Sequence, residues 1–302
     1  MSDFSAATIA RLIPLGLARQ GIEMPAPSIP NRAHIALDWK RSLLTSIAQT
    51  HGEQTLARIG EGVFDLPDEP AASALLPARD PADLFARWQR LERYFHSKHR
   101  IEMELAGAGR AVLGHRSIRA GTQPTRFEDL LILGLLVGLL ERIGARRLRA
   151  RVRGETRWRY EDRKWTTRSW PETVSSWEFD WDDAVVDPPR PTQPAEERDA
   201  VTRARQILSG DLGRGWTIAR LAADMNLSSR SLQRRLAQGN SGFTVLLAQA
   251  RASNAARLLG TSTQAAAQIG YLCGYSDQAH FNREFRRQVG CTPLQFRAGF
   301  AG

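Results

Sequence analysis

The pattern of apolar and polar positions is clearest in the C-terminal third of the chain, where it predicts short helices joined by tight turns. The segment 216–225 has Thr217 as a candidate N-cap and places a set of apolar residues on one helical face: Ile218, Leu221, Ala222 and Met225. The period then breaks for three residues. A second helix is predicted to start at Ser229, with Leu232 and Leu236 facing inward and mostly basic or polar residues on its other sides. Helix, tight turn and basic helix form the order of a helix-turn-helix unit.

The same order recurs further along the chain. A helix of small residues is predicted over 265–273, and a basic helix over 277–289 follows after a three-residue turn. In the basic helix, Phe281 and Phe285 form an inward pair at i, i+4, and Gly290 is placed to end the helix. The sequence therefore predicts a second helix-turn-helix unit.

A long apolar helix over 243–259 separates the two units and would fix their spacing. Its packing residues are Val245, Leu246, Ala250, Ala256 and Leu259. An α-helix fits the DNA major groove, where Arg pairs with guanine and Gln or Asn with adenine. Two such helices on one rigid monomer could enter successive groove segments about 34 Å apart.

Charge strengthens this interpretation because it is unevenly placed. The chain of 302 residues has 42 Lys and Arg against 32 Asp and Glu, a formal charge of +10. Residues 200–302 contain 13 Arg, no Lys and four acidic residues, so they carry +9 of that excess. A basic domain of this kind is typical of proteins that bind a polyanion, and double-stranded DNA is the expected partner. The alternative, an acidic membrane surface, predicts a Lys-rich amphipathic helix, which the segment lacks.

The segment 266–297 resembles the signature of the AraC/XylS family of bacterial transcription regulators, and the resemblance extends over about 201–300. The matching positions are Gly274, Tyr275, Gln278, His280, Phe281, Arg283, Phe285, Gly290, Thr292, Pro293, Phe296 and Arg297. The resemblance implies that bases are read by Arg230, Gln233 and Arg234 in the first unit and by Gln278, Ala279 and Arg283 in the second, with Arg287 as a further DNA-binding residue. One departure is Gly270, where the family more often has Ala; a Gly inside a helix costs up to about 1 kcal/mol.

The segment 182–199 contains four of the 15 prolines and is predicted to be an extended linker. It would join an N-terminal α+β domain, residues 1–181, to the all-α C-terminal domain with two helix-turn-helix units, residues 200–302. Helices are predicted over 31–49, 80–99 and 127–143; strands over 101–105, 111–118, 148–153 and 156–160. In the second helix Asp80 is the N-cap and Pro81 the first residue, followed by an apolar stripe: Leu84, Phe85, Trp88, Leu91 and Phe95.

The N-terminal domain resembles the helix-rich arabinose-binding-type domain of some family members more than the commoner cupin barrel. The resemblance implies that it senses a small-molecule effector or forms a homodimer. The candidate effector-binding residues are Trp158, Trp165 and Trp170, part of a cluster of five Trp with several Arg. The alternative for the cluster is core and edge packing.

The histidines and cysteines are interpreted as structural residues. His96 and His99, at i, i+3 on one predicted helix, permit a metal, but no carboxylate set completes a site, so no metal is expected. His115 is interpreted as structural, and His280 as a turn-packing or phosphate-facing residue. Cys273 and Cys291 are the only cysteines; they provide no disulfide framework and are expected to be buried and reduced.

These features predict a cytoplasmic transcription regulator, with RNA polymerase as a further partner if it is an activator. The apolar stretch 130–140 is too short to span a bilayer, and the N-terminus lacks the pattern of a secretory signal. An enzyme fused to a DNA-binding module is the alternative from another class. Alkyl-transfer chemistry needs a reactive thiolate, and residues 1–199 contain no Cys. The sequence also has no evident phosphate-binding loop. We therefore expect no catalytic activity and no cofactor. A non-specific architectural DNA protein would lack groove-reading helices and fits worst.

Overall fold

The computed structural model describes residues 4–24, 34–66, 70–96, 98–105, 109–120, 122–182, 200–239 and 241–299. These residues fall into two compact units. The first unit holds most described residues up to 182, and the second holds residues 200–299 together with 70–74. The predicted linker lies outside the described residues except for Asp182, the last residue of a strand.

The N-terminal unit contains a six-stranded antiparallel sheet with the order β3-β4-β8-β5-β6-β7, and a separate pair, β1-β2. The strands are β1 (Phe4–Ala6), β2 (His34–Ala36), β3 (His99–Leu105), β4 (Arg110–Ser117), β5 (Arg146–Val152), β6 (Tyr160–Glu161), β7 (Lys164–Trp165) and β8 (Ser176–Asp182). In the central strand β8, the alternating residues Trp177, Phe179 and Trp181 are buried. One face of the sheet therefore contributes to the core.

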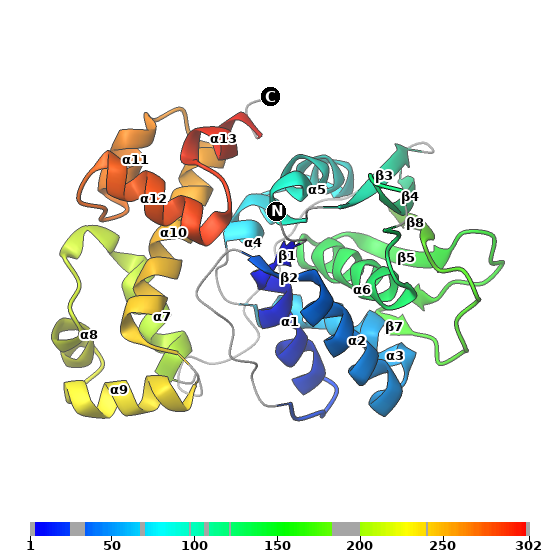
Figure 1. The fold of residues 1–302 in the computed structure, drawn as a ribbon, viewed down its shortest axis with the longest axis horizontal. Coiled ribbons are helices and arrows are strands. Elements are labelled where there is room, and N and C mark those ends of the chain that lie inside the picture. The colour runs from blue at the N-terminus through cyan, green and yellow to red at the C-terminus, as the bar shows by residue number, and fades with distance from the viewer. Residues whose placement is uncertain are drawn as a thin grey trace. The chain divides into compact units, whose positions relative to one another are not determined.

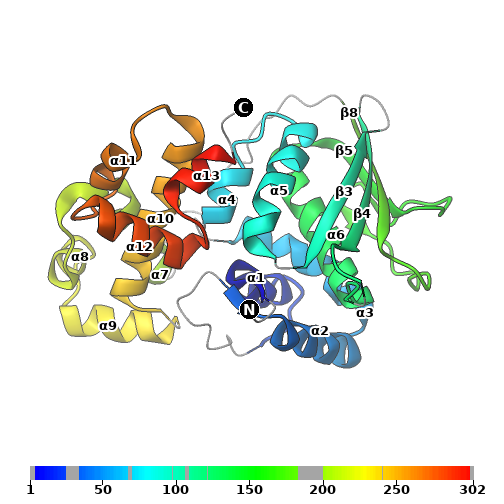
Figure 2. The same ribbon diagram turned by 45° about the horizontal axis from the view of Figure 1, so that its top comes forward.

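Helices complete this core. They are α1 (Ala7–Ala18), α2 (Leu37–His51), α3 (Glu53–Arg58), the 3-10 helix η1 (Ile59–Phe64), α5 (Pro81–Phe95) and α6 (Arg126–Arg142). The helix α4 (Pro70–Leu75) belongs, except for Leu75, to the C-terminal unit. Figure 2 shows α5 and α6 along one face of the sheet, and the α5 ring of Phe85 meets Phe179 edge to face at 5.7 Å. α6 is apolar around most of its circumference and is buried almost throughout, as its composition predicts.

The helix predicted over 80–99 begins where it was expected, but the observed helix ends four residues before the predicted end. Asp80 accepts a hydrogen bond from the Asp83 N–H at 2.8 Å, which confirms the N-cap, and Pro81 is the first helical residue. The helix ends at Phe95, however, and His99 is the first residue of β3, where it pairs with Ser117 of β4. The interpretation of His96 and His99 as neighbours on one helix is therefore wrong, because pairing with β4 draws His99 into the sheet.

Three other N-terminal predictions can be compared with the structure. The hairpin is confirmed by the antiparallel β3 and β4, although the turn residues Gly107 and Ala108 lie outside the described residues. The helix predicted over 31–49 starts at Leu37, because residues 34–36 pair with β1 instead. The strand predicted over 156–160 is limited to its last residue, Tyr160, which starts β6. The buried side chain of Arg159 bonds to Glu155 and to the carbonyls of Arg168 and Ser169.

The described part of the C-terminal unit is entirely helical, so the predicted fold class, α+β followed by all-α, is confirmed. Besides α4, its elements are α7 (Ala200–Gly210), the 3-10 helix η3 (Leu212–Arg214), α8 (Ile218–Asp224), α9 (Ser229–Gln238), α10 (Phe243–Thr261), α11 (Ala266–Leu272), α12 (Gln278–Val289) and α13 (Pro293–Ala298). α10 runs between the α8–α9 pair and the α11–α12 pair (Figure 1). α7 and α13 are helices that the sequence pattern did not predict.

Two apolar clusters hold the C-terminal helices together. The first joins α7 to α10 and includes Leu208, Trp216, Leu221, Leu232, Leu236 and Leu246. The second contains Phe281, Phe285 and Phe296, whose rings meet edge to face at 5.5 and 5.6 Å. No helix within the described ranges is long and apolar enough to cross a bilayer.

Candidate nucleic-acid interface

The same turn geometry precedes both basic helices. After α8, the N–H of Leu227 donates to the Ala222 carbonyl at 2.8 Å and the N–H of Asn226 donates to the Ala223 carbonyl at 3.0 Å. This pair of bonds is a Schellman motif, which requires a residue in the left-handed region, and Asn226 adopts φ +56°. Asn is one of the few non-glycine residues that tolerate that conformation. The turn therefore depends on a specific residue rather than on a generally polar loop.

The turn after α11 repeats this arrangement with glycine. The N–H of Tyr275 donates to the Gly270 carbonyl at 3.0 Å, the N–H of Gly274 donates to the Tyr271 carbonyl at 2.9 Å, and Gly274 has φ +78°. A Cβ at Gly274 would also lie 2.3 Å from the backbone oxygen of Leu212, so the close approach of η3 excludes a side chain. The resemblance of the two units noted in the sequence therefore extends to their backbone hydrogen bonds.

Side-chain caps fix where the two basic helices begin. Ser228 Oγ accepts from the Ser231 N–H at 3.1 Å at the start of α9, and an Asp277 carboxylate oxygen accepts from the His280 N–H at 2.7 Å at the start of α12. The bond from the His280 N–H holds the pKa of Asp277 below its usual value. Both caps satisfy N–H groups that the helix itself leaves unpaired, so each helix has a defined first turn.

Burial divides each basic helix into an inner and an outer side. Leu232 and Leu236 of α9 are buried, as are Phe281 and Phe285 of α12. All residues for which DNA binding is predicted lie on the exposed side: Arg230, Gln233 and Arg234 of α9, and Gln278, Ala279, Arg283 and Arg287 of α12. Each helix thus presents side chains with the hydrogen-bonding groups that read base edges.

Arginines in the C-terminal unit differ in what they contact. Arg287 pairs with Glu284 of its own helix at 2.6 Å, whereas no ion pair joins Arg283 to another described residue. Arg214 forms an ion pair with Asp224, and Arg220 donates to the carbonyls of Arg214 and Gly215 at 2.9 and 2.7 Å. Part of the positive charge therefore supports the fold of the first helix-turn-helix unit. The guanidinium of Arg283 has no such structural bond among the described residues.

Comparison with known proteins identifies the kind of domain in the C-terminal unit. The family model of a helix-turn-helix domain matches residues 221–299. The C-terminal region is an AraC-type helix-turn-helix domain. The chain is 35% identical over 100 residues to the HTH-type transcriptional activator CfaD and to the dual transcriptional regulator Rns, both from Escherichia coli. Each alignment covers 33% of this chain and 38% of the relative, so the chain spans well under half of these relatives' length.

One solved structure aligns along most of the chain. It is the transcriptional regulator CdpR from Pseudomonas aeruginosa, with 17% identity, coverage of 96% of this chain and 98% of the other, and a TM-score of 0.34. A TM-score of this size does not establish a shared fold. The similarity to CfaD and Rns is confined to a third of the chain, so the N-terminal resemblance to an arabinose-binding-type domain stays a prediction.

His280 in the AraC-type domain has a structural role at the turn. Its Nδ1 lies 3.0 Å from the Ser276 hydroxyl oxygen, and its ring meets Tyr275 edge to face at 5.5 Å. These contacts agree with the turn-packing interpretation. Cys273 and Cys291 are both buried, and burial raises the pKa of the Cys273 thiol to about 12, which keeps it in its unreactive protonated form.

Three large apolar side chains of the AraC-type domain are exposed, which we did not predict from the sequence. Tyr271 and Leu272 at the end of α11 are 78% and 50% exposed, and Leu294 on α13 is 63% exposed. The helical period of α11 does indicate this exposure, because Tyr271 and Leu272 lie outside the inward face that Ala266 and Ile269 define.

The three candidate effector-binding tryptophans lie in the N-terminal unit. Trp158 is contacted by the guanidinium groups of Arg149 and Arg151 at 4.8 and 4.5 Å from its ring centre. Trp165 and Trp170 meet edge to face at 6.2 Å, and Trp170 is buried beneath Arg159. Each ring therefore has packing partners, and an effector-binding role stays a prediction.

Proposed function

We propose that the protein is a sequence-specific DNA-binding transcription regulator that reads two successive major-groove segments with α9 and α12. One observation carries the proposal: two capped basic helices follow the same Schellman turn, and each exposes base-reading side chains while its apolar side is buried. A helix-turn-helix unit docks its second helix in the major groove. α10 joins the two halves and would set the spacing between the reading helices.

The predicted DNA-binding residues differ in their expected roles. Arg230, Arg234 and Arg283 can donate two hydrogen bonds to guanine, and Gln233 and Gln278 can pair with adenine. Ala279 can contact a thymine methyl group. Arg287 is better suited to a phosphate, because its ion pair with Glu284 would have to loosen before it reached a base edge.

The names of the relatives support regulation of transcription over catalysis. CfaD is named an activator and Rns a dual regulator. We extend the first of these names to this chain and propose activation, with RNA polymerase as the further partner. A protein acting on chromosomal DNA works in the cytoplasm of a bacterium.

The N-terminal unit is proposed to sense a small molecule or to form a homodimer. A ligand that binds only the folded form raises its apparent stability, so a thermal-shift screen of metabolites tests sensing. Light scattering of the purified chain tests the dimer. A monomer with no hit in a broad screen would contradict both roles.

The test of DNA reading compares two arginines of equal charge. We expect Arg283→Ala to cost about 1 to 3 kcal/mol of specific affinity and to relax the preference at one base pair. The matched control is Arg257→Ala on α10, which removes the same charge from a residue that binds Asn254 at 2.7 Å on a helix with no assigned base contact. Selection of binding sites from random DNA measures the base preference of each variant. An unchanged preference for Arg283→Ala would refute base reading by α12.

A further inference from the structure

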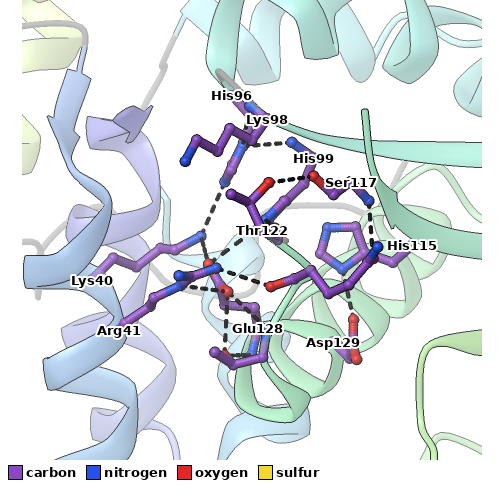
Figure 3. A network of polar contacts seen from close by, with 12 residues as sticks. Lys40, Arg41, His96, Lys98, His99, His115, Ser117, Thr122, Glu128 and Asp129 are labelled. Carbon is purple, nitrogen blue, oxygen red and sulfur yellow. Dashed lines mark hydrogen bonds and ion pairs between the residues drawn. The ribbon is translucent and has the colours of Figure 1, made fainter. Parts of the chain in front are cut away.

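A buried group of polar side chains lies where α2, α6 and the junction of α5 with β3 meet (Figure 3). We call it the Lys40 cluster and define it as Lys40, His96, His99 and Glu128. Lys40 is 3% exposed, His99 1% and Glu128 0%. Lys40 Nζ lies 2.7 Å from Glu128 Oε1 and 3.3 Å from His96 Nε2, and the two imidazole rings stack with centres 4.4 Å apart. Burying this many ionisable groups is costly unless their contacts compensate.

His99 has a nitrogen that its surroundings leave unused. Its Nε2 lies 3.0 Å from the Thr122 carbonyl oxygen, which can only accept, so Nε2 carries the ring proton of the neutral imidazole. Nδ1 therefore presents a lone pair. That atom is buried, has no hydrogen-bond partner among the described residues, and lies 3.9 Å from Glu128 Oε1. A buried acceptor without a donor is unfavourable and calls for an explanation.

The contact between Lys40 and His96 is also imperfect. His96 Nδ1 accepts from the backbone N–H groups of Lys98 and His99 at 3.3 and 3.1 Å, which places the ring proton of the neutral imidazole on Nε2. Nε2 then faces the Lys40 ammonium, so two donors point at each other. The opposite tautomer relieves this conflict only by giving up the two backbone bonds. Lys40 thus forms an ion pair with Glu128 but is poorly matched to the His96 imidazole.

The same atoms match the ligand preferences of a transition metal. His96, His99 and Glu128 each offer one ligand atom, and these atoms all lie within 4.8 Å of one another. Two imidazole nitrogens and one carboxylate oxygen form a common zinc ligand set, and a bond from the second ring nitrogen to a backbone carbonyl is the usual support for such a His. Arg41 Nε holds the other Glu128 oxygen at 3.0 Å and would keep the carboxylate in place.

We propose that the Lys40 cluster is a binding site for a divalent transition-metal ion of the zinc type, with the Lys40 ammonium as the competing occupant. A metal ion would use the His99 lone pair and displace Lys40 from Glu128 Oε1. It would also shift His96 to its other tautomer, so the metal–nitrogen bond would have to offset the loss of the two bonds from the Lys98 and His99 N–H groups. The sequence lacked the information for this site, because Glu128 approaches the two His only in the folded chain. The proposal goes beyond DNA binding, and binding to the purified chain tests it without DNA.

The experiment removes the competing cation and measures metal binding directly. Full-length wild type and Lys40→Met are titrated with Co²⁺, whose visible absorption reports its ligands, and with Zn²⁺ in competition. We expect Lys40→Met to bind Co²⁺ about tenfold more tightly than wild type or better, and adding His99→Leu to this variant to weaken binding by about 100-fold. His51→Ala in the Lys40→Met background is the control, because His51 is an exposed residue outside the cluster.

Every outcome bears on the proposal. Absence of Co²⁺ binding in wild type and Lys40→Met alike, equal affinity of the two, or binding that survives His99→Leu would overturn it. If Lys40→Met is unfolded without metal, refolding on addition of Zn²⁺ supports the site and failure to refold counts against it. Lys40→Gln, which keeps a polar group beside Glu128, provides the second test of the same affinity gain. None of these results depends on the DNA-binding role of α9 and α12.

Discussion

Gly270 is a departure from the family pattern for which the structure gives a reason. A Cβ added at this position of α11 would lie 2.8 Å from Phe281 Cδ1 and 3.0 Å from Cγ of the same ring. The fully buried Phe281 ring therefore occupies the space that an alanine methyl group would need. Higher helix propensity favours alanine by up to about 1 kcal/mol, whereas overpacking a core costs about 1 to 3 kcal/mol.

We accordingly expect Gly270→Ala to lower the free energy of unfolding by about 1 kcal/mol, despite the gain in helix propensity. Gly210→Ala at the end of α7 is the control, since a Cβ there meets no atom within 4 Å, and it should leave stability unchanged or raise it slightly. Urea unfolding of the three proteins measures both effects. A stabilised Gly270→Ala would show that Phe281 moves aside at little cost.

Glu92 makes the stability of the N-terminal unit depend on pH. Its carboxylate accepts from the Ile101 N–H at 2.8 Å and from the Trp88 indole at 3.2 Å, yet burial raises its pKa to about 7, and Arg100 is the nearby cation that opposes the shift. Because the folded pKa exceeds the unfolded one, this contribution to stability is fully present below pH 4.5 and is lost as pH rises through 7. The protonated carboxyl is thus the form that the fold favours.

For Glu92→Gln we expect this dependence to disappear. Relative to the variant, wild type should be more stable at pH 5 than at pH 8, by a difference on the order of 2 kcal/mol. Chemical unfolding of both proteins at the two pH values measures it. Comparing the variant with wild type cancels the contributions of His96 and His99, whose pKa values burial lowers. Parallel pH profiles for the two proteins would contradict the assignment.

At the scale of elements, the turn between α8 and α9 depends on the left-handed residue Asn226. Asn226→Gly should be tolerated within a few tenths of a kcal/mol, whereas Asn226→Ala should destabilise by about 1 kcal/mol, because alanine is strained at φ +56°. Thermal unfolding ranks the two variants. Equal stability would mean that the Schellman motif does not determine how α9 follows α8. Specific DNA affinity should fall with Asn226→Ala for the same reason.

At the scale of the whole molecule, nearly all excess charge belongs to residues 200–302, since residues 1–199 contribute only +1. We expect a fragment starting near residue 196 to bind DNA with an affinity that falls steeply with salt, with the same slope of log K against log salt as the full chain. The apolar cluster of α7 to α10 lies entirely within this fragment. Fluorescence anisotropy over a salt series measures both slopes. A fragment whose DNA affinity does not change with salt concentration would refute the argument that its positive charge drives DNA binding.

The sequence by itself determined the elements whose signals are local. The period of Leu232 and Leu236, the caps at Thr217 and Asp80, and the glycine that ends α12 all act within a few residues, so their patterns are readable along the chain. The boundaries of α11 and α12 were predicted to within one residue on that basis. The same period predicts that the DNA-binding candidates are exposed, because they occupy the helix positions that do not face the core.

Only the tertiary structure decided features that join distant segments. His99 leaves the predicted helix because Ser117 pairs with it, and the space beside Gly270 is defined by a ring on another helix. The Lys40 cluster exists because Glu128 meets Lys40 and the neighbouring His96 and His99, so that three separate parts of the chain come together. Such contacts depend on packing between elements, and no pattern of neighbouring residues encodes the distances between them.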